Sequence, residues 1–159
     1  EVRLELAGMF ESAELRADLE SECGWRRTEY HGTISRPEVA HVLSRVRAGL
    51  VVLRPVPNHL NSQPNKMFEY MSVGLPVIAS DFPLWRNFVS DNECGILVDP
   101  ESPEAIAEAM RWILDNLEEA EAMGLRGQQL VSQTYNWSVE ERKLTTLYNQ
   151  LLAIRGSTL

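Results

Sequence analysis

Hydrophobic and polar positions follow two periods along the chain, one typical of strands and one typical of helices. Short apolar runs bounded by turn residues predict strands over 2–7, 27–31, 49–53, 77–79 and 96–98. Apolar residues that recur every three or four positions predict helices over about 13–23, 36–46, 103–117, 119–133 and 138–154. Strands and helices alternate before a helical tail, which predicts an α/β fold with a Rossmann-like parallel sheet flanked by helices.

Several of the predicted helices carry an apolar side that we expect to face a core. Leu15 and Leu19 have this role in the first helix, and Ser35 is the expected N-cap of the second. Ser102 and Pro103 supply the start of the next long helix. Its apolar stripe consists of Ile106, Ala109, Met110, Ile113 and Leu117. The last helix presents Leu144, Leu147, Tyr148, Leu151 and Leu152 on one side.

Residues 61–81 form the stretch around which the rest of the chain is organised. They predict a loop, a short helix, a turn and a buried strand. Pro64 suits the first turn of the helix, where a missing N–H is no loss, and Gly74 ends it. The inward side of this helix consists of Met67, Phe68 and Met71. Free backbone N–H groups at the helix start, with Lys66 beside them, favour an anion such as phosphate.

The candidate site lies at the carboxyl ends of the strands, because parallel α/β sheets bind ligands at that edge. The loops expected there contain Gly8, Gly32, Pro55, Ser80 and the 61–66 segment. Trp85 and Arg86 follow the strand over 77–79. They either approach a ligand or belong to a short helix anchored by a buried tryptophan, and we favour the anchored helix.

Composition and charge narrow the functional classes. The chain has 159 residues and a formal charge of −8, which argues against a nucleic-acid partner because such proteins need a basic surface. Cys23 and Cys94 lie far apart, so a reduced intracellular chain is expected. The histidines His31, His41 and His59 have no metal-ligand spacing, and no metal site is expected. No apolar run reaches membrane-spanning length, which favours a soluble, cytoplasmic domain.

The 61–81 stretch resembles the signature of retaining glycosyltransferases of the GT-B type, in the large family four. The matching positions are Pro64, Lys66, Glu69, Tyr70, Gly74, Pro76, Val77, Ile78 and Ala79. The resemblance extends to the segments 6–8, 30–34, 95–98 and 135–138. One position departs from the family pattern. Asn61 stands where members usually carry the first of two glutamates, and an amide brings no negative charge.

The resemblance covers nearly the whole chain, but only as the C-terminal half of a GT-B enzyme. It implies that residues 1–159 are the nucleotide-sugar-binding domain, and that the first strand of this domain and the N-terminal acceptor domain are absent. The parent would be a retaining hexosyltransferase that moves a sugar from a nucleoside-diphosphate sugar to a saccharide or lipid-linked acceptor. Bacterial surface polysaccharide synthesis, peripheral association with the inner face of the cell membrane, and independence from metals and other cofactors are implied with it.

The resemblance also implies roles for particular residues. Glu69 would accept hydrogen bonds from the ribose hydroxyls of the donor, and Asn61 would contact a sugar hydroxyl. The diphosphate would face the loop and helix start, whose residues are Ser62, Gln63, Pro64, Asn65 and Lys66. The base would pack against Tyr30, His31, Gly32 and Thr33. No residue of the chain is given a catalytic role, and the chain alone is expected to be inactive.

Each role has an alternative that needs no ligand. Glu69 and Lys66 are spaced to form an ion pair on an exposed helix surface, and 61–66 fits an ordinary solvated loop. Tyr30 fits a packed aromatic residue at a strand end. Two other kinds of protein also stay open at the level of the parent. One is a sugar-nucleotide epimerase of the same shape, and the other is a non-catalytic interaction domain, for which Asn61 is the supporting feature.

Overall fold

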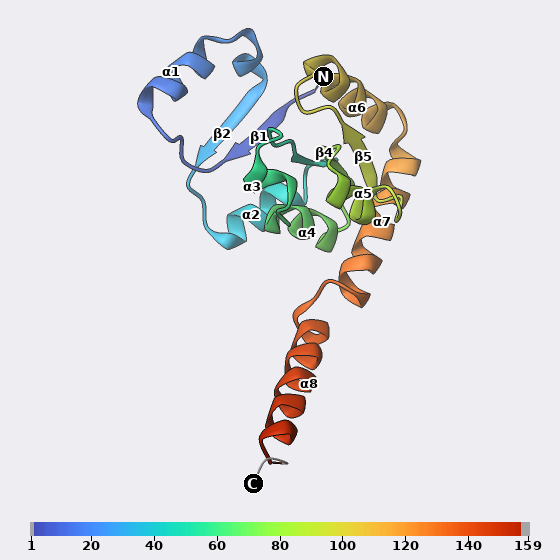
Figure 1. The fold of residues 1–159 in the computed structure, drawn as a ribbon. Helices are drawn as coiled ribbons and strands as arrows, with labels where there is room; N and C mark the ends of the chain where they lie inside the picture. The colour runs from blue at the N-terminus through green and yellow to red at the C-terminus, as the bar shows by residue number, and fades with distance from the viewer. Residues whose placement is uncertain (1, 157–159) are drawn as a thin grey trace. The chain divides into compact units, whose positions relative to one another are not determined.

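The structure is a computed structural model that describes residues 2–156, and side chains up to residue 153. The chain divides into two compact units (Figure 1). The first unit ends at Val46 and the second begins at Arg47. Each unit has its own parallel sheet, so the two are described separately.

The first unit is built on two parallel strands. Its elements are β1 (Leu4–Ala7), α1 (Ala13–Ser21), a 3-10 helix (Cys23–Arg27), β2 (Thr28–Gly32) and α2 (Arg36–Leu43). In the register of β1 and β2, Leu4 lies opposite Thr28 and Glu5 lies opposite Glu29. The register shifts at the end of β1, so that Ala7 lies opposite Gly32. Gly32 has a φ of 65°, a left-handed conformation that glycine adopts without steric strain.

Aromatic rings gather around Tyr30 in this unit. The ring centroid of Tyr30 lies 5.0 Å from that of Phe10 and 6.0 Å from that of Trp25. The guanidinium of Arg16 lies over the Tyr30 ring, at 5.2 Å from its centroid. The Tyr30 hydroxyl donates a hydrogen bond to the carbonyl oxygen of Gly8 at 2.9 Å. Tyr30 is therefore a packed aromatic residue that links the two strand ends.

The expectation that Leu15 and Leu19 face a core is wrong. Leu15 is 43% exposed and Leu19 is 40% exposed, and α1 contains no buried residue. A two-stranded sheet offers too little surface to bury the side of a helix, since independent cores need more strands or further packing. The second helix does begin as predicted, with Ser35 as its N-cap. The Glu38 carboxylate accepts hydrogen bonds from the backbone N–H and the hydroxyl of Ser35.

The second unit is built on three parallel strands in the order β3-β4-β5. Its elements are β3 (Gly49–Val51), α3 (Pro57–Leu60), α4 (Asn65–Ser72), β4 (Val77–Ser80), α5 (Pro83–Val89), β5 (Gly95–Val98), α6 (Pro103–Asp115), α7 (Leu117–Gln133) and α8 (Trp137–Gly156). Gly49 lies opposite Val77, and Val77 lies opposite Gly95. No strand predicted from the sequence in this part of the chain is missing.

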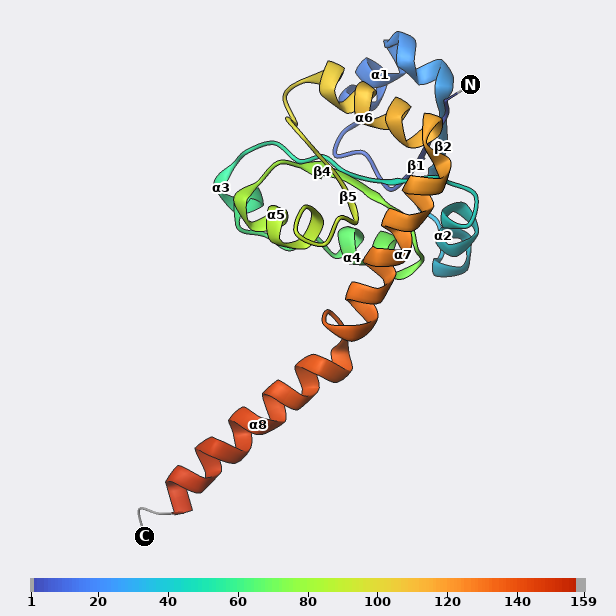
Figure 2. The same cartoon turned by 90° about the vertical axis from the view of Figure 1, so that its right-hand side faces the viewer.

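Helices cover both faces of this sheet, because side chains alternate along each strand. On one face, Val51, Val77 and Ala79 pack with residues of α4 and α5. On the other face, Ile78 and Val98 pack with Ala109 and Ile113 of α6. Figure 2 shows α6 on one side of β4 and β5, and α4 and α5 on the other. All four residues of β4 are buried, as expected for a central strand covered on both sides.

The predicted fold class is confirmed, while the arrangement of the strands differs from a single sheet. All strand pairs are parallel, and helices flank the sheet of the second unit. The strands fall into two sheets because, among residues 2–156, no strand is hydrogen-bonded to both β1 and β3. Helix α3 was not expected, since its Pro57–Leu60 segment is a single turn inside a predicted loop.

The three helices predicted for the C-terminal part of the chain are present, but two details of the prediction are wrong. Ser102 caps α6, and its hydroxyl accepts a hydrogen bond from the Ala105 N–H at 3.1 Å. Helix α6 ends before Asn116, so Leu117 belongs to α7 and is not part of the α6 stripe. The apolar side of α8 is exposed rather than packed. Its exposed large side chains are Trp137, Leu144, Leu147, Tyr148, Leu151 and Leu152.

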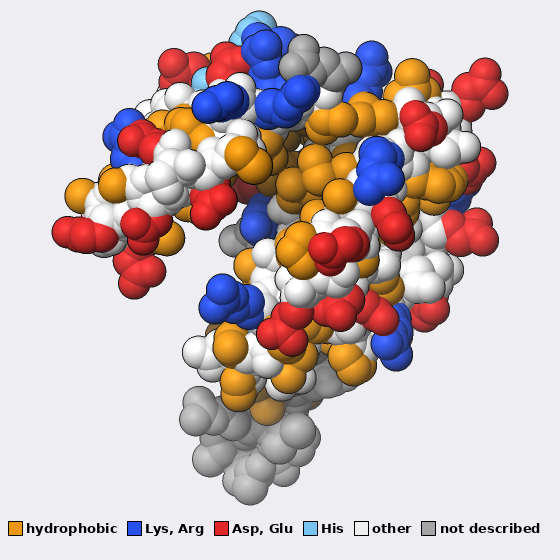
Figure 3. Space-filling model, turned by 90° about the horizontal axis from the view of Figure 1, so that it is seen from above, with side chains coloured by type: hydrophobic (Ala, Val, Ile, Leu, Met, Phe, Trp, Pro, Cys, Tyr) orange, Lys and Arg blue, Asp and Glu red, His pale blue; other side chains and the backbone are white. Residues whose placement is uncertain are grey.

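Acidic, basic and hydrophobic side chains are interspersed over the face shown in Figure 3. Within residues 2–156, no helix combines the length and the apolar character needed to cross a lipid bilayer.

Candidate functional site

Helix α4 fixes the direction of the candidate site residues. Met67 and Met71 are fully buried on its inner side, as the sequence predicts. The helix ends at a turn in which Gly74 has a φ of 76° and the Leu75 N–H donates to the carbonyl of Tyr70 at 3.0 Å. Burial of the two methionines leaves Glu69 on the exposed side of the helix. Lys66 lies one turn before Glu69 and is half-buried.

Lys66 and Glu69 do not form the ion pair that the sequence allows. Within the described part of the chain, neither side chain has a hydrogen bond or an ion pair. Burial lowers the pKa of the Lys66 ammonium, because desolvation disfavours the charged form. Burial also raises the pKa of Tyr70, with a smaller contribution from the negative charge of Glu69. Helix α4 therefore carries a lysine and a glutamate, one turn apart, that have no ion-pair partner among the described residues.

The start of α4 lacks a side-chain cap. The N-cap is Pro64, which provides no side-chain hydrogen bond to the helix start. Pro64 thus lies one position before the first turn where the sequence had suggested it. Its carbonyl accepts the N–H of Met67 at 3.0 Å, so the helix is hydrogen-bonded from its first turn. Backbone N–H groups at an uncapped helix start attract negative charge.

The signature loop, which we define as residues 61–66, runs from the end of α3 into the first two residues of α4. Asn61, Gln63 and Asn65 are exposed, whereas Ser62 is half-buried. The indole N–H of Trp85 donates to the Ser62 carbonyl at 2.8 Å. The Ser62 hydroxyl donates to the carbonyl of His59 at 3.0 Å. Trp85 is fully buried, which confirms the expected tryptophan-anchored helix. Its hydrogen bond to the loop was not foreseen.

Residues at the carboxyl ends of β3 and β4 are bonded to each other rather than free. The Ser80 hydroxyl is fully buried and forms 2.8 Å hydrogen bonds with both the N–H and the carbonyl of Leu53. Asp81 follows β4 and accepts two hydrogen bonds from Arg86, at 2.6 and 2.9 Å. These hydrogen bonds lower the pKa of the Asp81 carboxyl. Ser80 thus connects β4 to the segment that follows β3, and Arg86 is paired with Asp81 in the loop between β4 and α5.

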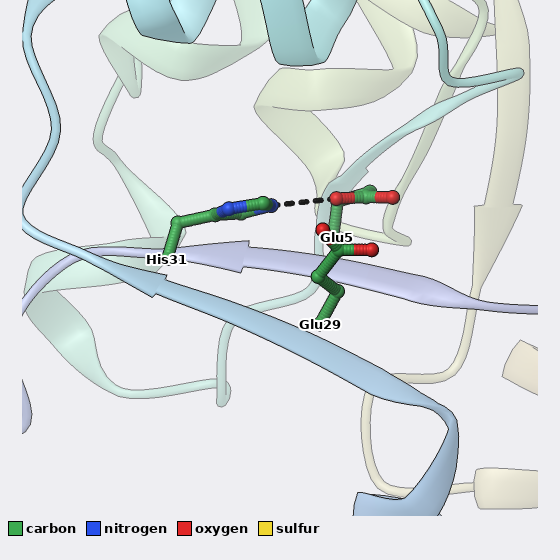
Figure 4. Close-up of side chains that lie close together, drawn as sticks. All are labelled: Glu5, Glu29 and His31. Carbon is green, nitrogen blue, oxygen red and sulfur yellow. Dashed lines mark hydrogen bonds and ion pairs between the residues drawn. The ribbon is translucent and has the colours of Figure 1, made fainter.

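The residues predicted for the base pocket lie in the first unit, at the end of β2. The His31 imidazole is hydrogen-bonded to the Glu5 carboxylate, with 2.6 Å between Nε2 and Oε2 (Figure 4). Glu29 lies close to both groups on the same face of the sheet. The signature loop belongs to the second unit, so the structure describes the two groups of predicted residues separately.

The Glu5, Glu29 and His31 cluster was missed in the sequence because it joins two strands. Each carboxylate already has a cationic neighbour. Arg3 lies 2.9 Å from Glu29, and Arg45 lies 3.7 Å from Glu5. Glu29 and His31 are two positions apart on one strand, so the sequence indicates that they share a face of the sheet. Which residue of β1 lies opposite them depends on the strand register, which the sequence pattern does not give. The network connects β1 to β2 through the hydrogen bond between Glu5 and His31.

The sequence matches a known family. Residues 1–116 match the profile of the family described as "Glycosyl transferases group 1". A D-inositol 3-phosphate glycosyltransferase of Corynebacterium glutamicum is 34% identical over 85 residues, which are 54% of this chain and 20% of that protein. A phosphatidyl-myo-inositol mannosyltransferase of Mycobacterium leprae is 33% identical over 91 residues, 57% of this chain and 24% of that protein. The chain thus spans less than a quarter of these curated relatives.

Solved structures share the fold over most of the chain. The sucrose-phosphate synthase of Thermosynechococcus elongatus has a TM-score of 0.80 and 28% identity, covering 96% of this chain and 39% of that one. HepE of Anabaena, solved in complex with UDP, has a TM-score of 0.77 and 17% identity, with coverages of 93% and 41%. The C-terminal domain of a Francisella tularensis group 1 glycosyl transferase has a TM-score of 0.61 and 20% identity, with coverages of 78% and 62%.

Proposed function

The chain belongs to the group 1 glycosyl transferases, and we propose that it binds the nucleoside-diphosphate sugar donor of a retaining glycosyltransferase. The observation that carries this proposal is the pair of uncompensated charges on α4. Glu69 is exposed, Lys66 is half-buried, and neither has an ion-pair partner among the described residues. A donor ligand would supply a partner for each of them.

The chemistry of the donor fits this pair. A ribose offers hydroxyl donors, and the Glu69 carboxylate is an acceptor. A diphosphate offers negative charge, for which Lys66 and the open start of α4 are suited. Asn61 lies at the other end of the signature loop, and its amide would contact a hydroxyl of the transferred sugar. The base would pack beside Tyr30, His31, Gly32 and Thr33.

The same groups suit the departure of the diphosphate. Glycosyl transfer places positive charge on the sugar and negative charge on the leaving group. Backbone N–H groups and a cation stabilise that developing negative charge without a metal ion. Burial of Lys66 strengthens its effect, because electrostatic interactions grow as water is excluded.

The proposal extends to a longer parent protein. We infer that residues 1–159 are its donor-binding C-terminal domain, and that the first strand of the domain and an acceptor domain lie outside this chain. The short coverage of the relatives supports this inference. The acceptor would be a saccharide or a lipid-linked sugar in bacterial surface polysaccharide synthesis. The parent would work in the cytoplasm, at the inner face of the cell membrane.

Titration of UDP and GDP into the intact protein tests the role of Glu69. We expect Glu69→Ala to weaken nucleotide binding by about 10- to 100-fold, because hydrogen bonds to a charged group contribute about 1.5–3 kcal/mol. Glu121→Ala is the matched control, since Glu121 is also an exposed glutamate within a helix. Equal affinities for Glu69→Ala and the wild type would refute the ribose role.

A second variant separates binding from stability at Lys66. Lys66→Met should weaken nucleotide binding while leaving the free protein at least as stable, because a buried ammonium without a partner opposes folding. The pKa of Lys66 is lowered in the folded state, so its desolvation penalty is complete below that pKa. The penalty disappears as the pH rises toward the unfolded value of about 10.4. The wild type should therefore approach the variant in stability at high pH. Lys143→Met on α8 is the control, and a loss of stability in Lys66→Met would contradict the idea.

A further inference from the structure

Half of the residues of the signature loop are exposed, but its Ser62 is hydrogen-bonded on two sides. On one side, Ser62 bonds to α3. Its N–H and its hydroxyl both donate to the His59 carbonyl, at 3.2 and 3.0 Å. The His59 ring is in turn hydrogen-bonded to the Arg54 carbonyl at 2.9 Å. On the other side, the Ser62 carbonyl accepts the Trp85 indole N–H at 2.8 Å.

The Trp85 bond differs from the others because its donor is inside the core. Trp85 is fully buried, and its ring lies 4.8 Å from that of Phe82. A buried indole N–H needs a hydrogen-bond partner, and Ser62 provides the one found here. The two residues are separated by 23 positions in the sequence. The loop is therefore attached directly to the buried core of the second unit.

We propose that Trp85 is a positioning residue that holds the signature loop in its nucleotide-binding conformation. This inference rests on the proposed function of the loop. Trp85 itself does not contact the donor, because its side chain has no exposed surface. It acts through the Ser62 backbone, on either side of which lie Asn61 and the segment that leads to Lys66. If the hydrogen bond is lost, the loop visits other conformations, and the apparent affinity falls with the fraction that stays competent.

Two variants test the hydrogen bond. Trp85→Phe keeps an aromatic ring and removes the N–H. Replacement of Trp85 by benzothienylalanine keeps the size of the indole and puts sulfur in place of the N–H, so it separates the hydrogen bond from packing. Val89→Ala is the control, because Val89 is a fully buried residue of the same helix and core with no bond to the loop.

The measurements are amide hydrogen exchange of residues 61–66 and the affinity of the intact protein for UDP and GDP. Both Trp85 variants should speed up exchange in the loop and weaken nucleotide binding by about 2- to 10-fold, the fold-change that one hydrogen bond supplies. Val89→Ala should change neither. Unchanged exchange in the benzothienylalanine variant would overturn the proposal, as would faster exchange with unchanged affinity. If the wild type binds neither nucleotide, the proposed function fails, while the exchange data still decide whether Trp85 fixes the loop.

Discussion

The two units of the chain are stabilised in different ways. None of residues 2–46 is buried, whereas all of the buried hydrophobic residues described lie beyond residue 46. The first unit depends on an aromatic cluster, on charge pairs such as Arg3 with Glu29, and on the hydrogen bond between His31 and Glu5. The second unit depends on two apolar cores, one on each face of its sheet. Small segments without a core are marginally stable by themselves, so the first unit should be the more easily opened.

This difference bears on the two groups of predicted site residues. The signature loop is attached to a buried core through Trp85, whereas Tyr30 to Thr33 end a two-stranded sheet. A loop fixed before the ligand arrives gives up less conformational freedom on binding. We therefore expect the contacts of the ribose and diphosphate to be pre-formed, and those of the base to be the more adaptable ones.

The largest expected effect comes from truncating an apolar side chain in each unit. Met71→Ala in the second unit should reduce the free energy of unfolding by about 2–5 kcal/mol, because Met71 is fully buried. Leu19→Ala in the first unit should change it by about 0.5 kcal/mol, as at other surface positions. Urea denaturation of both variants measures the difference. Similar losses would show that the first unit buries more in solution than the structure indicates.

Replacing a glycine by alanine should give the next largest difference in stability between the two units. A Cβ at Gly124 on α7 would lie 1.9 Å from the Gly74 carbonyl oxygen, so Gly124→Ala should destabilise by about 1–3 kcal/mol. This outcome opposes helix propensity, which favours alanine by about 1 kcal/mol. At Gly24 in the first unit, no atom lies within 4 Å of the added Cβ, and Gly24→Ala should be neutral or stabilising. Thermal unfolding would distinguish the two, and a stable Gly124→Ala variant would contradict the close packing of α7 on Gly74.

Local chemistry explains why much of the second unit could be predicted. The two buried methionines of α4, the Gly74 turn and the apolar run of β4 follow one another within residues 61–81. Each is specified by neighbours in sequence. The same holds for Ser102, whose capping bond reaches only three residues ahead. Short-range rules therefore located the signature loop and its helix.

Contacts between distant residues could not be predicted in this way. The Trp85 bond to Ser62, the Ser80 bonds to Leu53 and the Glu5 contact with His31 each join segments more than twenty positions apart. They depend on strand register and helix placement, which the pattern of apolar residues does not specify. The prediction that Leu19 faces a core was wrong for a related reason. Its helix has Leu15 and Leu19 one turn apart on one side, but the two-stranded sheet does not cover that side.

Removal of a helix cap should also affect the stability of the two units differently, but by a smaller amount. Ser102 and Ser12 each accept a backbone N–H at 3.1 Å, at the starts of α6 and α1. Ser102→Ala should lower global stability by about 1 kcal/mol, because α6 packs on the sheet. Ser12→Ala should mainly loosen α1, which buries no residue, and leave global unfolding almost unchanged. Hydrogen exchange measured beside urea denaturation separates local from global effects. A large global loss in Ser12→Ala would mean that α1 unfolds together with the second unit.

The smallest effect concerns the exposed pair of Asp81 and Arg86 after β4. Hydrogen bonds from Arg86 lower the pKa of Asp81 in the folded state. The pair therefore adds stability above the unfolded pKa of about 3.9, and that stability is lost as the pH falls through the folded value. Arg86→Met should be slightly less stable than the wild type at pH 7 and equal to it near pH 2. Because both side chains are exposed, salt should weaken the difference. A difference that persists in acid would show that Arg86 acts through packing of its side chain rather than through its charge pair with Asp81.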